Sequence, residues 1–182
     1  MRLTLLLSAA LLAGAPVAHA ADYVAAPGST LGFSAKFQGE GTQVRFTRFT
    51  PTIRFDPAHL DTARFDVSID LASAATGEDD GDTLVRGPDF FATAQFPQAR
   101  FQATRVRALG GGRFAADGTL SLRGVRKPAV LSFQWTPGPR PVLDGQASLR
   151  RLDFGITAGE FSSEIGNEVK VTTHLVLAPA KP

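Results

Sequence analysis

The sequence predicts an all-β fold, an antiparallel β-barrel with one short helix. Apolar and polar residues alternate in several short segments, turn residues separate these segments, and no long helix is available to connect parallel strands. The pattern is clearest between residues 100 and 135, where a triple glycine at 110–112 and the stretch 124–128 allow two reversals. No strong edge protection is visible, so closure into a barrel is expected.

The first twenty residues predict a signal peptide. Arg2 supplies a positive start, residues 3–13 are almost wholly apolar, and Ala18-His19-Ala20 has the small-x-small pattern of a cleavage site. The apolar run is shorter than the roughly 20 residues of a membrane helix, and no second run approaches that length. We therefore expect an exported protein without a membrane span, with a mature domain at residues 21–182.

Composition argues against a nucleic-acid partner. The formal net charge is +2 and becomes +1 once Arg2 is removed. Basic residues are scattered between apolar strand positions and form no dense patch. The chain contains no cysteine, which excludes disulfides and a cysteine for lipid attachment.

The first half of the chain predicts a hairpin followed by two further strands. Residues 31–37 alternate, reverse at Gly39, and resume the pattern at Val44 and Phe46. A short strand around residues 53–55 ends at Asp56-Pro57, which begins a turn that extends to about residue 63. Residues 65–71 show the cleanest alternation in the chain.

The region 72–98 breaks the strand pattern and predicts a short helix. Ser73 or Thr76 is a candidate cap, and the acidic residues at 78–82 suit the positive end of a helix that continues to Val85. Gly87-Pro88 should end this helix. The apolar stretch that follows, Phe90-Phe91 with Phe96-Pro97, is expected to cover one end of the sheet.

The last third predicts two long strands after a stiff exposed connection. Three prolines at 137–141 exclude a central strand there. Residues 143–156 are expected to form one strand and residues 169–177 the final one. The chain then has about nine strands without a long crossover helix, which favours an antiparallel sheet.

Four motifs, in this order, resemble a known family. They are Asp89-Phe90-Phe91, Phe96-Pro97 with Arg100-Phe101, the Gly118 to Pro128 pattern, and Arg151 to Ile156. Together they resemble the YceI-like polyisoprenoid-binding family over residues 23–177. The resemblance implies an exported bacterial protein whose extended, lipocalin-like antiparallel barrel holds a long isoprenoid or similar lipid. Many members carry two histidines where this chain has Gly28 and Phe37, so no polar role is carried over to those positions.

The aromatic inner face is the main candidate for ligand binding. The chain has 14 phenylalanines, and an eight-stranded barrel is just wide enough either to be filled by side chains or to hold one ligand. Both possibilities remain open at this point. Trp135 is expected on the same inward face of its strand as Leu131 and Phe133. Because it also precedes the proline-rich connection, it is expected at a barrel mouth. The candidate ligand-binding residues are Phe33, Phe37, Phe46, Phe65, Val67, Ile69, Phe101, Leu131, Phe133, Trp135, Arg151 and Phe154.

Arg151 and Asp153 leave three alternatives. The inward parity changes along the predicted strand 143–156, so either a bulge switches the faces or both side chains point inward as a buried pair. An inward Arg151 could also anchor a polar or anionic lipid headgroup.

No pattern in the sequence indicates catalysis, a cofactor or a metal. The acidic residues at 78–82 lack the spacing of a calcium loop, and neither His59 nor His174 has a partner motif at a useful distance. We therefore expect a protein that is not an enzyme.

The leading hypothesis is a periplasmic lipid-binding protein that carries or sequesters a polyisoprenoid, such as a prenyl quinone or a similar long-chain lipid, inside the barrel. The alternative is an envelope interaction protein with a filled barrel, for example a soluble partner of a membrane redox protein. An enzyme acting on a lipid tail ranks third. The sequence also leaves a homodimer open.

Overall fold

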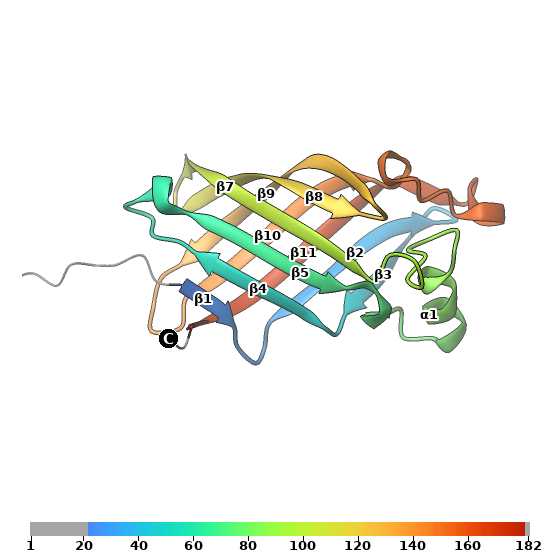
Figure 1. The fold of residues 1–182 in the computed structure, drawn as a ribbon, viewed down its shortest axis with the longest axis horizontal. Coiled ribbons are helices and arrows are strands. Elements are labelled where there is room, and N and C mark those ends of the chain that lie inside the picture. Colours follow the sequence, from blue (N-terminus) through green and yellow to red (C-terminus); the bar gives the residue numbers. More distant parts are fainter. Residues whose placement is uncertain (1–21, 181–182) are drawn as a thin grey trace, which may run out of the picture.

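The computed structural model describes residues 22–180 and shows an elongated, twisted β-barrel with one short helix at one end (Figure 1). The predicted signal peptide lies outside these residues. The only α-helix in the described part is α1 (Asp79–Arg86). The strands are β1 (Asp22–Ala25), β2 (Thr30–Phe37), β3 (Glu40–Phe46), β4 (Phe49–Arg54), β5 (Arg64–Asp70), β6 (Ala74–Ala75), β7 (Gln98–Gly110), β8 (Arg113–Leu122), β9 (Val125–Thr136), β10 (Val142–Arg150) and β11 (Ile165–Pro179). Single 3-10 turns occupy Leu60–Thr62, Leu71–Ser73, Arg151–Phe154 and Gly159–Phe161.

Eight antiparallel strands close the barrel in the order β1-β4-β5-β7-β8-β9-β10-β11, because β11 pairs back onto β1. The fold class predicted from the sequence, an all-β antiparallel barrel with one short helix, is therefore confirmed. No helix within residues 22–180 is long and apolar enough to cross a membrane.

The final strand β11 changes partners along its length. Its first part, from Ile165 to His174, pairs with β2, which continues into β3 and β6. Its last part, from Leu177 to Pro179, pairs with β1. The wall beside β11 is thus built by β2, β3 and β6 toward one end, and by β1 and β4 toward the other.

The two ends of the barrel carry different elements. We call the end with α1, the β2–β3 turn and the two turns between β10 and β11 the helix end; the opposite end, with β1 and the β7–β8 turn, is the closed end (Figure 1). Each end has its own cluster of buried apolar residues. One includes Leu71, Phe91 and Phe154, and the other includes Phe55 and Phe133.

Two predicted element boundaries were wrong. The strand predicted over residues 143–156 ends at Arg150, because a 3-10 turn follows and Gly155 adopts a left-handed backbone with φ of 69°. The helix begins at Asp79, and Glu78 precedes it without a capping hydrogen bond from its side chain. Gly87 follows the last residue of the helix, as predicted.

Candidate functional site

An apolar cavity of about 480 Å³ occupies the half of the barrel toward the helix end. Its wall comes from the inner faces of most strands, and α1 with the following loop contributes Leu84, Val85, Phe90 and Phe91. The sequence predicted that this loop covers one end of the sheet, and the structure agrees. Phe91 packs against Phe33 and Phe46, with ring centroids 5.7 and 5.9 Å apart.

The exposed fraction of inward side chains differs along a single strand, and this difference shows which half of the barrel is hollow and which is packed. On β5, Phe65 is 2% exposed, whereas the next inward residues, Val67 and Ile69, are only half-buried although both face the barrel interior. On β9, Phe133 is 3% exposed and Leu131 is half-buried. Because the wall shields inward side chains from bulk solvent, this exposure is to the cavity. The barrel is therefore filled at the closed end and hollow at the helix end.

Aromatic rings fill the closed end. The ring of Phe55 lies 6.2 Å from Phe65, 5.0 Å from Phe114, 5.3 Å from Phe133 and 4.8 Å from Trp135, between centroids. All four are edge-to-face contacts, a favoured arrangement of aromatic pairs. This cluster forms a floor beneath the cavity.

The structure brings ten of the twelve predicted ligand-binding residues to the cavity wall. These residues are Phe33, Phe37, Phe46, Phe65, Val67, Ile69, Phe101, Leu131, Arg151 and Phe154. The sequence analysis did not select Leu149, Val169 and Val171, which also line the wall. Their inward parity on the last two strands was a usable signal.

Phe133 and Trp135 lie in the packed closed end and do not line the cavity. Trp135 is 6% exposed and packs against Tyr23, with ring centroids 5.7 Å apart, so its expected place at a mouth was wrong. The predicted inward parity was correct. However, β9 runs from the hollow half into the filled half, and parity alone does not show where along the barrel axis a residue lies.

Arg151 is buried, with 6% exposure, and its guanidinium forms hydrogen bonds with backbone carbonyls. Its Nε donates to Gly166, its Nη1 to Ile156 and Thr157, and its Nη2 to Ser162 and Ile165, always to carbonyl oxygens at 2.8–3.2 Å. These bonds tie the 3-10 turn after β10 to the segment that begins β11.

Of the three alternatives left open for Arg151, the buried pair with Asp153 does not form, because Asp153 is exposed and accepts no bond from this guanidinium. The face switch comes from the end of the strand at Arg150 and not from a bulge within a strand. All five N–H donors of Arg151 have a backbone acceptor, so none is left over for a lipid headgroup.

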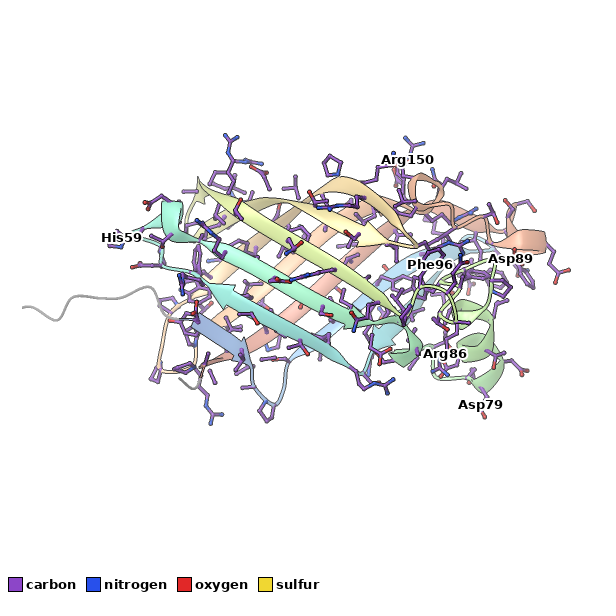
Figure 2. All side chains as sticks on the ribbon, in the orientation of Figure 1. His59, Asp79, Arg86, Asp89, Phe96 and Arg150 are labelled. Carbon is purple, nitrogen blue, oxygen red and sulfur yellow. The ribbon has the colours of Figure 1, made fainter. Side chains whose placement is uncertain are left out.

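Helix α1 is held to the barrel at its base. Arg86 Nη2 donates to the Ala74 carbonyl at 2.6 Å and to Asp82 at 3.0 Å, and Asp82 accepts from the Thr76 backbone N–H at 2.6 Å. Hydrogen bonds from Thr76 are the main cause that lowers the pKa of Asp82. Figure 2 shows Arg86 beside the barrel and Asp79 on the outer side of the helix.

Ion pairs lie on the outer surface of the barrel. Arg54 donates two bonds to Asp22, at 2.7 and 2.8 Å, and a hydrogen bond from Arg100 lowers the pKa of Asp66. His59 sits at the closed end, far from α1 (Figure 2). Within residues 22–180, no three His, Cys, Asp or Glu side chains gather as metal ligands.

Comparison with known proteins identifies the family. A model of the YceI-like domain matches residues 22–177. The chain belongs to the YceI-like family. This YceI-like chain is 33% identical over 169 residues to a UPF0312 protein of Azotobacter vinelandii, and the match covers 84% of each chain. The family resemblance noted in the sequence motifs is therefore confirmed.

Solved structures share the fold of this YceI-like chain. The crystal structure of Burkholderia cenocepacia BcnA has a TM-score of 0.78 and 26% identity, covering 82% of this chain and 96% of that one. A polyisoprenoid binding domain from Saccharophagus degradans, implicated in plant cell wall breakdown, has a TM-score of 0.68 and 22% identity, covering 89% and 100%. At 22% identity, the second likeness concerns the fold alone.

Proposed function

We propose that this protein binds a polyisoprenoid, such as a prenyl quinone or a similar lipid, and carries or sequesters it in the periplasm. The observation that carries the proposal is the hollow half of the barrel, an apolar cavity of about 480 Å³ within a wall that is otherwise well packed. Support also comes from the family and from the Saccharophagus degradans neighbour, whose name describes a polyisoprenoid binding domain.

Transfer of hydrocarbon into such a cavity is strongly favourable. Ten methylene groups taken out of water contribute about 8 kcal/mol before the costs of association and ordering. Aromatic wall residues such as Phe33 and Phe101 provide broad contact surfaces for this hydrocarbon. Binding through apolar contact alone selects the chain of the lipid more than its headgroup.

The wall is suited to binding and not to chemistry. The Arg151 donors are all used by backbone carbonyls, and the Thr173 hydroxyl donates to the Thr30 carbonyl at 2.9 Å. We therefore propose a binding protein and not an enzyme. The alternative of an envelope interaction protein, for example a soluble partner of a membrane redox protein, rested on a filled barrel, which describes only the closed end.

Filling the cavity from its wall should weaken lipid binding. Ala147 is half-buried and lines the cavity on β10, so Ala147→Trp places an indole where the ligand chain lies. We expect affinity for farnesol to fall by about tenfold or more, since several buried methylenes of the ligand are displaced. Competition against a fluorescent fatty acid measures the change.

Ser148→Trp is the matched control, because Ser148 is the next residue on β10 and is exposed on the outer face. Its affinity should equal that of the unmodified protein. If both tryptophan variants bind farnesol as well as the parent, or if the parent yields no extractable lipid and binds no prenyl compound, the proposal fails.

Export is a separate prediction. The run at residues 3–13 and the Ala18-His19-Ala20 pattern should direct the chain out of the cytoplasm with cleavage after Ala20. Intact-mass measurement of protein from the periplasmic fraction should give a chain that begins at Ala21. A mass that still includes residues 1–20 contradicts this prediction.

A further inference from the structure

We infer that the cavity is a length gauge: it takes one hydrocarbon chain, tail first, to a depth of about fifteen to twenty carbons and stops at the aromatic floor. This inference rests on the proposed function and deepens it by naming the part of the lipid that is bound. A longer polyisoprenoid is then held by its terminal units only, and the remainder stays outside the barrel.

The volume sets the depth. A cavity of about 150 Å³ suffices for benzene, which corresponds to about 25 Å³ for each carbon. At that density a cavity of about 480 Å³ holds about nineteen carbons, or roughly four isoprene units. This falls well short of the chains of long polyprenyl lipids.

The floor is rigid and continuous. Phe65 lines the cavity and is 2% exposed, and its far side packs against Phe133, with ring centroids 5.4 Å apart. Ile53 and Leu175, which are 1% and 4% exposed, complete the base and belong to the same buried cluster. Because interiors packed in this way have no space for additional atoms, a chain cannot pass beyond Phe65 without unpacking the closed end.

The placement of polar groups sets the direction. Apart from Arg151 and Thr173, the polar residues that line the cavity are Lys36, Thr42, Thr76 and Glu78, which come from the β2–β3 hairpin and from the segment before α1, all at the helix end. Deeper in the barrel, the Thr173 hydroxyl already donates to Thr30. A headgroup buried against Phe65 would lose its hydrogen bonds to water without replacement. The head therefore stays at the helix end.

A chain-length series tests the gauge. Delipidated protein is titrated with geraniol, farnesol, geranylgeraniol and solanesol in competition with a fluorescent fatty acid. Affinity should rise by about tenfold or more for each added isoprene unit while the chain fills the cavity. Beyond about four units it should change by no more than about twofold, because the additional units lie outside.

A variant that raises the floor makes the test specific. Val67 is half-buried and is the next inward residue above Phe65, so Val67→Phe fills existing space and shortens the cavity. The plateau should move to a shorter prenol by one unit or more. Thr50→Phe, on the exposed face of the neighbouring strand β4, is the matched control and should leave the plateau unchanged.

The outcomes separate the gauge from the proposed function. If no prenol of any length binds, both are overturned. If prenols bind but affinity continues to rise through solanesol, or if Val67→Phe leaves the plateau in place, the gauge alone is overturned. A plateau that shifts with Val67→Phe and not with Thr50→Phe supports both.

Discussion

Replacement of Arg151 with methionine is expected to lower the free energy of unfolding by about 3–5 kcal/mol, a cost typical of breaking a buried, charged hydrogen-bonding arrangement. Methionine fills a similar apolar volume but donates no hydrogen bond. Buried acceptors left without a donor each cost about 1–3 kcal/mol. The carbonyls that lose their donor belong to Ile156, whose bond is buried, and to Thr157, Ser162, Ile165 and Gly166, whose bonds are partly buried, so water replaces part of the loss at these four.

The neighbouring residue provides the control. Arg150 is exposed and projects from the barrel surface (Figure 2), so Arg150→Met should change stability by less than about 0.5 kcal/mol. Arg151→Lys keeps the charge but supplies three donors on one nitrogen in place of a planar fork, so it should recover only part of the loss. Urea denaturation measures all three variants. Equal midpoints for Arg151→Met and Arg150→Met would show that the backbone contacts contribute little.

Phe133→Ala should cost about 3–5 kcal/mol, the range for a large aromatic residue removed from a filled core. Phe133 is 3% exposed, and its ring contacts Phe55, Phe65 and Phe114 with centroids 5.3–5.5 Å apart. Truncation removes contacts on every side and leaves a void enclosed by rings that cannot collapse into it. Lipid affinity at short chain lengths should stay within about threefold of the parent, since Phe133 does not line the cavity.

Phe33→Ala is the contrasting variant. Phe33 is half-buried, and one side of its ring already faces the cavity, so fewer contacts are lost and the stability cost should be smaller. Its effect on farnesol affinity should be the larger of the two. Denaturant melts of lipid-stripped protein measure the stability of both variants, and titrations of the same samples measure their farnesol affinity. A reversed order in either measurement would contradict the division of the barrel into a filled half and a hollow half.

The sequence predicted the faces of the strands well because side-chain parity is a local property. Alternation placed Phe65, Val67 and Phe133 inside the barrel, and all three are inside. It could not show that Val67 borders empty space while Phe133 is enclosed. That difference depends on the register between strands that are not consecutive in the chain, such as β5 and β7, where Phe65 pairs with Ala103.

The alternation pattern could not predict the role of Arg151, for a related reason. Leu152, Phe154 and Ile156 alternate like β10 but on the opposite parity, and this change did not show whether the strand forms a bulge or ends at Arg150. The acceptors of the guanidinium are backbone carbonyls in the segment 156–166. Every residue has such a carbonyl, so the sequence does not show which of them accept these hydrogen bonds. Gly155, with its left-handed backbone, was a second local sign of a break beside the change of parity.

The change of partners along β11 divides the barrel into regions that should open independently. Hairpin β2–β3 pairs only with the first part of β11 and with the two residues of β6, whereas β1 pairs with the last part of β11 and with β4. In native-state hydrogen exchange, amides of β2 and β3 should exchange through local openings, and those of β5 and β9 beside the aromatic rings only through global unfolding. Bound lipid should then slow exchange mainly in the hairpin, which identifies that hairpin as the part of the wall that yields when a chain enters or leaves.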